Sequence, residues 1–285
     1  MTFHPRLGCS SISFRQQDLP TALATIRQIG FEEIDLGALP GVCNHVPFDL
    51  TAYSVTEVVR EVSESGITVR SVNGDIGDLN LPLDTAARTA RTQHLNRLLS
   101  LTAGVGAQAL VLPCGAQDHN PVSTLEEDLV LVAQELAAAS QMAATYGVEL
   151  WTESLHFFRL SWNLHIASRL HELLAGTGVG IVMDFSHIVA AGNDPLDYVA
   201  RFAPVVRHVH LRDAVPGNIH LSIGNGAADF ESGISALLKA GYEGHFALEL
   251  ETRDISHDER PAMTARSGSY ISDIIANNST QEVVQ

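Results

Sequence analysis

The chain has 285 residues, 45% of them hydrophobic, and its 17 basic and 33 acidic residues give a formal net charge of −16. A surface of this charge repels phosphate backbones and argues against a nucleic-acid partner, while the lack of an 18-residue apolar run and of a signal peptide argues against a membrane partner or export. The three scattered cysteines, Cys9, Cys43 and Cys114, form no CxxC motif and no disulfide framework, so we expect a soluble, cytoplasmic protein.

Short apolar segments alternate along the chain with longer segments of helical periodicity. The predicted strands are 6–14, 31–37, 67–74, 108–115, 148–154, 179–187, 206–213 and 245–253. The predicted helices between them are 19–30, 52–66, 85–107, 124–147, 164–178, 194–204 and 230–244. The helices repeat apolar residues at a spacing near 3.6, as in Leu129, Val132 and Leu136. The strands are nearly continuous apolar runs, which is typical of parallel strands covered on both faces.

This alternation predicts a single (β/α)₈ TIM barrel. Eight β/α units in 285 residues match such a barrel in number and length, and glycines at the predicted helix ends, such as Gly30 and Gly66, are typical of left-handed caps. An open doubly wound sheet is the alternative, but it needs a glycine-rich phosphate turn after the first strand, and residues 9–17 contain none. We expect one catalytic domain over residues 1–276 and a flexible C-terminal tail over 277–285.

Ionisable residues stand at the ends of the last four predicted strands, where barrel active sites lie. They are Glu153, Asp184, His210 and Glu249. One acid at a strand end is usually a turn residue or a helix cap, but three buried carboxylates brought together would repel one another unless a cation neutralised them. Three oxygen ligands and one imidazole suit Mn²⁺, with Mg²⁺, Co²⁺ and Zn²⁺ as alternatives. The pattern predicts one divalent metal ion.

The succession Glu153, Asp184, His210, Glu249, together with the stretches MDFSH, HVHLRDA, IGNGAADF and ALELE, resembles the xylose-isomerase-like barrel superfamily. The resemblance covers most of the chain and is best from residue 148 onward. It is specific for the fold and the metal site. It is not specific for the substrate, because the superfamily contains sugar isomerases and epimerases as well as dehydratases, lyases and endonucleases.

The resemblance implies a catalytic role for two of the metal ligands. In the epimerases of this group, the acids that match Glu153 and Glu249 both bind the metal and carry protons. One removes a proton next to a metal-bound carbonyl, and the other returns a proton from the opposite face of an enediolate-like intermediate. The residues that match His187 and Arg212 bind substrate oxygens. We therefore expect a metal-dependent isomerase or epimerase of a sugar or keto-sugar.

Further substrate-binding candidates rest on weaker signals. His156 and Arg159 follow Glu153 in ESLHFFR and could line the mouth of the site, although exposed loop residues are an equal alternative. His45 follows the second strand, and a loop histidine in such a place is more often without a role. Several other residues have an ordinary structural interpretation beside a functional one: Asn73 and Asp75 as turn formers, Trp151, Phe14 and Phe185 as core, and Gly224 and Gly226 as a tight loop rather than a phosphate site.

Three other functions compete with the isomerase prediction. A metal-dependent dehydratase or keto-glycoside lyase shares the proton abstraction and is the main alternative. An abasic-site endonuclease needs further metal ligands, and Cys114 and Asn218 stand where a histidine and an aspartate are expected. A noncatalytic sugar-binding barrel needs no metal ligands at all. The identity of the sugar and the assembly state stay open, with a homo-oligomer among the alternatives.

Overall fold

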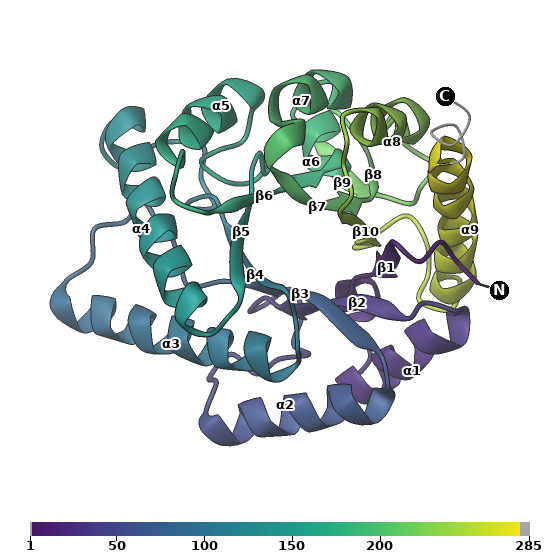
Figure 1. Ribbon diagram of the computed structural model, residues 1–285, viewed down its shortest axis with the longest axis horizontal. Helices are drawn as coiled ribbons and strands as arrows, with labels where there is room; N and C mark the ends of the chain where they lie inside the picture. The colour runs from purple at the N-terminus through teal and green to yellow at the C-terminus, as the bar shows by residue number, and fades with distance from the viewer. Residues whose placement is uncertain (1, 280–285) are drawn as a thin grey trace.

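The computed structural model describes residues 2–279 and has the predicted barrel at its centre (Figure 1). The eight barrel strands are β1 (Leu7–Cys9), β2 (Glu33–Ala38), β3 (Thr68–Gly74), β4 (Ala109–Pro113), β5 (Glu149–Glu153), β6 (Gly180–Asp184), β7 (Val206–Leu211) and β10 (His245–Leu248). They form one sheet in the order β1-β10-β7-β6-β5-β4-β3-β2, and every hydrogen-bonded pair is parallel. The two end strands, β1 and β2, contact each other, so the sheet is nearly closed.

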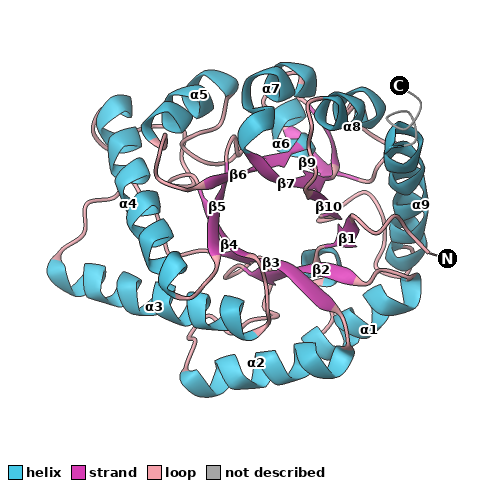
Figure 2. Cartoon of the chain, viewed as in Figure 1, coloured by secondary structure: helices cyan, strands magenta, loops and turns pink. Residues whose placement is uncertain are grey.

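Helices form a ring around the strands (Figure 2). They are α1 (Leu19–Ile29), α2 (Ala52–Ser65), α3 (Thr85–Gly104), α4 (Leu125–Thr145), α5 (Leu164–Leu173), α7 (Pro195–Phe202), α8 (Phe230–Lys239) and α9 (Arg260–Ser279). Gly30 and Gly66 end α1 and α2 in the left-handed conformation, with φ of 118° and 67°. This confirms the interpretation of these glycines as caps, because the conformation is strained for a residue with a Cβ atom.

The structure corrects several predicted strand ends, mainly at the carboxyl side of the barrel. The first strand stops at Cys9 and is followed by the 3-10 helix η1 (Ser11–Phe14). The sixth strand stops at Asp184, and the short helix α6 (Phe185–Ala190) starts at once. The seventh strand, β7, stops at Leu211 and is followed by a hairpin of β8 (Asp213–Val215) and β9 (Asn218–Leu221). A second 3-10 helix, η2 (Ala203–Val205), lies directly before β7. Apolar residues such as Ile12, Phe14 and Phe185 follow the ends of the first and sixth strands, so hydrophobicity alone predicted strands that are too long.

The C-terminal helix passes the predicted domain boundary. Residues 277–279, assigned to the tail from the sequence, belong to α9, and the remainder of the predicted tail, 280–285, lies outside the described residues. Gly268 of α9 lies against Phe3 and Phe31, which docks this helix beside the N-terminus. Within residues 2–279, every helix is too short or too polar to cross a membrane.

Side-chain alternation inside the barrel sets the positions of the predicted ligands on β5 and β6. Ala109, Val111, Trp151 and Val182 form a separate buried apolar cluster. Glu153 and Asp184 stand two residues after Trp151 and Val182 on their strands, so they share the inward face. Trp151 is 1% exposed, and Phe14 and Phe185 are also buried, in agreement with the core interpretation of all three.

Candidate active site at the carboxyl ends of the strands

The four residues predicted as metal ligands converge at one end of the barrel. Asp184 and His210 are paired across β6 and β7, while Glu153 ends β5 and Glu249 directly follows β10. His210 Nδ1 lies 3.3 Å from Glu153 Oε1 and 3.6 Å from Glu249 Oε2. One ligand atom from each of the four side chains lies within 4.8 Å of the others. With metal–ligand bonds of about 2.0–2.2 Å, a set of this size can surround a single ion.

Asp184 has a double role at the junction of β6 and α6. Its Oδ1 accepts hydrogen bonds from the backbone N–H of Ser186 (2.6 Å) and of His187 (3.2 Å), and from the Ser186 hydroxyl (2.6 Å). It therefore caps α6. Its Oδ2 is buried and has no hydrogen-bond partner among the described residues. A buried carboxylate oxygen without a hydrogen-bond donor is costly. This oxygen lies 3.6 Å from Arg212 Nη2 and 4.0 Å from His187 Nε2, and a bound cation would satisfy it.

The electrostatics of the cluster also fit a cation. Burial raises the pKa of Glu153, and it raises the pKa of Glu249 to about 8. Burial alone would lower the pKa of His210, but Glu249, Asp35 and Glu153 beside it raise that pKa well above its ordinary value. The pKa values of the two glutamates are therefore raised by an environment that disfavours negative charge, and a divalent cation would offset the repulsion between the carboxylates.

His187 and Arg212 flank the four ligands. His187 lies in the first turn of α6 and not at the end of the predicted strand 179–187, which corrects the sequence interpretation. Its Nδ1 accepts the backbone N–H of Phe157 (3.0 Å), so a neutral ring carries its proton on Nε2. That Nε2 lies 4.0 Å from both Glu153 Oε1 and Asp184 Oδ2. Arg212 is 1% exposed, donates from Nε to the Ser186 hydroxyl (3.0 Å) and lies 3.6 Å from Asp184 Oδ2.

A cavity of about 690 Å³ opens above the four ligands, and Glu153, His187, Arg212 and Glu249 line it. The weaker candidates His156 and Arg159 also line it, which favours their functional interpretation over that of exposed loop residues. The His156 ring stacks on His187 with centroids 3.8 Å apart. Arg159 is 6% exposed and pairs with Asp75 Oδ2 at 2.8 Å, so Asp75 reaches the cavity as well.

Asn73 contacts the cluster directly. Its side chain is 6% exposed and donates to Glu249 Oε1 at 3.2 Å, so it is not a turn former. This contact holds one Glu249 oxygen in place while the other lies near His210.

The structure does not bring His45 to the cavity. His45 is 5% exposed, its Nδ1 lies 3.0 Å from the Ser11 hydroxyl and 3.2 Å from Cys43 Sγ, and its Nε2 lies 3.1 Å from the backbone oxygen of Gln17. It is absent from the cavity lining. Both ring nitrogens are therefore engaged inside the fold, and the predicted contact with substrate is not supported.

The glycine loop after β9 already holds an internal anion. The N–H groups of Gly224, Gly226 and Ala228 donate to the Asp213 carboxylate at 2.8, 2.9 and 3.0 Å. Backbone donors that could hold a phosphate in this loop are thus occupied, which favours the interpretation of these glycines as a tight loop. Cys114 is fully buried and does not line the cavity.

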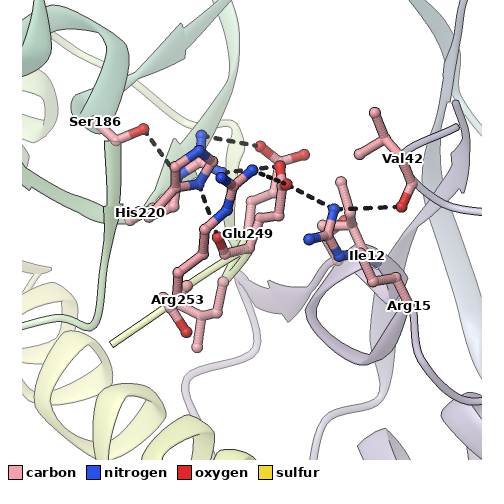
Figure 3. A network of polar contacts seen from close by, with 12 residues as sticks. Ile12, Arg15, Val42, Ser186, His220, Glu249 and Arg253 are labelled. Atoms are coloured by element: carbon pink, nitrogen blue, oxygen red, sulfur yellow. Dashed lines mark hydrogen bonds and ion pairs between the residues drawn. The ribbon is translucent and has the colours of Figure 1, made fainter. Parts of the chain in front are cut away.

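Several cavity residues were missed in the sequence. Glu251 lies between Arg15 (2.6 Å), Arg212 (3.6 Å) and Arg253 (3.8 Å), and this network links the cavity to η1 and the loop after β2 (Figure 3). Alternation from Glu249 to Glu251 and Arg253 could have revealed it. Other missed lining residues, Gln117, Asp118, His119, Asn120, Phe158 and His220, lie on loops or the hairpin and carry no periodic signal.

Curated proteins are similar to this chain over part of its length only. An inosose dehydratase of Geobacillus thermodenitrificans is 27% identical over 155 residues, covering 47% of this chain and 50% of the dehydratase. Uncharacterised mycobacterial proteins are 34% identical over 100 residues, covering 36% of their length. The chain thus spans half or less of the length of these curated relatives.

Solved structures match over nearly the whole chain. An L-ribulose 3-epimerase superposes with a TM-score of 0.78 at 17% identity, covering 100% of this chain and 98% of the epimerase. The IOLI protein with a bound zinc atom gives a TM-score of 0.76 at 17% identity, covering 96% and 99% of the two chains. At this identity the likeness establishes the fold. A sequence profile described as xylose isomerase-like TIM barrel matches residues 23–272, and so the chain belongs to that family.

Proposed function

We propose that this protein is a divalent-metal-dependent isomerase or epimerase that moves a proton next to the carbonyl of a sugar or keto-sugar. The observation that carries the proposal is the placement of two glutamates, half-buried Glu153 and buried Glu249, beside one histidine and one aspartate under one cavity. The four side chains would hold the cation, and Mn²⁺ suits a set of three oxygens and one nitrogen, with Mg²⁺, Co²⁺ and Zn²⁺ as alternatives.

The bound cation would supply Lewis-acid polarisation of the substrate carbonyl. Glu153 and Glu249 come from β5 and the end of β10, the outer two of four neighbouring strands, so they approach a substrate from different sides. One accepts the proton and the other returns one. A single base would mostly return the proton to the face from which it came, whereas two acids permit inversion.

His187 and Arg212 supply hydrogen-bond donors to substrate oxygens. Burial lowers the pKa of His187 well below its ordinary value, so the ring is neutral and its Nε2–H is the available donor. Arg212 is fixed by Ser186 and Glu251, which limits its motion when a substrate enters. His156 and Arg159, on the loop after β5, would contact the parts of the substrate that do not react.

A dehydratase is a second candidate, because the curated enzyme relative is an inosose dehydratase. Its first step is the same proton abstraction. In the second step an acid donates a proton to a hydroxyl group of the substrate, which leaves as water. A keto-glycoside lyase would differ only in the leaving group. The cavity of about 690 Å³ lies in the range of about 300–1,000 Å³ that accommodates drug-sized ligands, so it can hold more than one sugar ring.

Proton exchange tests the proposal and separates these reactions. The Mn²⁺-loaded protein is incubated in D₂O with ketoses, inososes and 3-keto-glycosides, and deuterium incorporation and products are followed by NMR. We expect exchange next to the carbonyl on at least one substrate. Epimers or isomers identify the proposed class, and an unsaturated or cleaved product identifies the dehydratase or lyase.

The matched variants are Glu153→Gln and Glu249→Gln. Each keeps an oxygen ligand but removes the proton-accepting group, so turnover should fall by at least about 10²-fold, the lower end of typical general-base contributions. Glu172→Gln, on the outer surface of α5, should keep full turnover. Wild-type turnover in either active-site variant would show that this glutamate is not an essential proton carrier. Exchange that persists in excess EDTA would show that the reaction does not need the metal.

A further inference from the structure

A second polar cluster lies inside the barrel, directly below the four ligands. Asp35 of β2 is fully buried, and its Oδ2 lies 2.7 Å from His208 Nε2 and 3.4 Å from His210 Nε2. Its Oδ1 accepts the Ser71 hydroxyl at 2.7 Å. His208 and His210 are two residues apart on β7 and both point inward. One carboxylate therefore faces both histidines of the barrel interior.

The hydrogen bonds of this cluster fix the proton of His208. The buried His208 Nδ1 has no hydrogen-bond partner among the described residues. A ring with one proton therefore places it on Nε2, where Asp35 accepts it, since an N–H left unpaired in the core would be costly. His210 differs in the metal-free protein: its Nδ1 lies 3.3 Å from Glu153 Oε1, and its Nε2, 3.4 Å from Asp35 Oδ2, makes no hydrogen bond among the described residues. A cation bound at Nδ1 would leave the ring proton on Nε2, which faces Asp35.

We propose that Asp35 is a positioning residue for the metal site, holding the His210 ring with its proton on Nε2 so that the Nδ1 lone pair is free to bind the cation. The inference rests on the proposed metal-dependent function. A carboxylate on the far side of a ligating imidazole fixes the ring orientation and increases its basicity. The Ser71 hydroxyl holds the other oxygen of Asp35 and leaves Oδ2 to the two histidines.

A second metal ion among Asp35, His208 and His210 is the competing interpretation, because these three side chains are also of ligand type and close together. The distances favour the positioning role. Two donor atoms that share a tetrahedral ion at about 2.0–2.2 Å lie about 3.3 Å apart. The 2.7 Å between Asp35 Oδ2 and His208 Nε2 is instead the length of a charge-assisted hydrogen bond.

The test is the affinity for the cation in Asp35→Asn. The neutral amide oxygen accepts more weakly from both histidines than the carboxylate does, so it favours a proton on Nε2 of His210 less. The dissociation constant for Mn²⁺, measured by chelator competition, should rise about 10–100-fold, the usual effect of losing such a partner. The visible spectrum of bound Co²⁺ should change as well. Ser71→Ala keeps the Asp35 carboxylate and its charge, so it should change the dissociation constant less than Asp35→Asn does.

The possible results separate the hypotheses. An Asp35→Asn protein that is folded by circular dichroism and has the wild-type dissociation constant and Co²⁺ spectrum would overturn the positioning role alone. Two ions per wild-type chain would overturn it in favour of a second metal site. Failure of the wild type to bind any cation would overturn both the positioning role and the proposed function.

A measurement on the wild type covers the case in which Asp35→Asn does not fold. In the Zn²⁺-loaded protein, ¹H–¹⁵N correlation spectra of the histidine rings identify the protonated nitrogen of His210, assigned with the variant His210→Gln. We expect a proton on Nε2 with the downfield shift of a hydrogen bond to a carboxylate. A proton on Nδ1 would contradict the inference.

Discussion

Single residues in this site serve both the fold and the chemistry. Asp184 caps α6 with one oxygen and leaves the other without a hydrogen-bond donor among the described residues. Ser186 donates its hydroxyl to Asp184 Oδ1 and accepts from Arg212 Nε. The cap thus fixes a proposed ligand and an arginine that lines the cavity through one hydroxyl group. Preorganisation of this kind is expected where charged groups must keep their geometry while ligands enter and leave.

The variant Ser186→Ala tests this coupling. It leaves the buried Arg212 Nε without an acceptor, which costs about 1–3 kcal/mol of folding free energy. Urea unfolding of the metal-free protein should show this loss, and the affinity for Mn²⁺ should also fall. Ser100→Ala, at an exposed position of α3, is the control and should change neither. Wild-type stability in Ser186→Ala would show that water replaces the hydroxyl.

Helix ends set the positions of whole elements around the barrel. Two outer helices, α2 and α4, begin with complete capping boxes, formed by Thr51 with Ser54 and by Thr124 with Glu127. Each box satisfies backbone N–H groups that have no partner within the helix. The loops that precede these helices carry cavity residues, Pro40 and Val42 before α2 and Asp118 and His119 before α4. A fixed helix start therefore also limits the motion of one side of the cavity.

Replacing the first cap should destabilise the protein measurably. Thr51→Ala removes the acceptor of the Ser54 N–H (3.1 Å), and we expect a loss of about 0.5–2 kcal/mol in urea unfolding. Thr56→Ala, inside the same helix and also exposed, is the matched control. Because alanine has the higher helix propensity, the control should be neutral or slightly stabilising. Equal losses in both variants would point to a general effect of threonine removal and not to the cap.

At the scale of the whole molecule, part of the negative charge of the chain lies inside the barrel. The net charge is −16, and Asp35, Asp184 and Glu249 are buried in the barrel with Glu153 half-buried beside them. Unpaired charges in such a place oppose folding. A bound divalent cation would offset part of this repulsion only in the folded state, so metal binding and folding should be linked.

Cation binding should therefore raise the stability of the protein. At a free Mn²⁺ concentration 100 times the dissociation constant, one site adds about 2.7 kcal/mol, and EDTA should reverse the increase in the unfolding midpoint. Asp184→Ala should abolish this increment. Asp273→Ala, an exposed acid of α9, should retain it. An increment that survives in Asp184→Ala would place the stabilising ion elsewhere on the molecule.

The sequence by itself determined the barrel and the four residues that gather at its mouth. Both follow from local rules: apolar runs and 3.6-residue periodicity define the units, and the carboxyl ends of parallel strands must meet at one side of the sheet. Glu153, Asp184, His210 and Glu249 stand at four such ends, so their meeting was predictable without coordinates. The capping glycines were predictable for the same reason, since their conformation depends only on the adjacent helix.

Only the tertiary structure decided which of the other polar residues reach the site. Asp35 and Asn73 approach the predicted ligands His210 and Glu249, which lie 175 and 176 residues away in the chain. Glu251 lies 3.6 Å from Arg212, which is 39 residues away. His45 was predicted to contact substrate, but the fold turns its ring toward Ser11 and Cys43. The physical reason is that periodicity gives the face on which a side chain lies, whereas its partners depend on strand register, barrel closure and the course of loops. Those are settled only when the whole chain packs.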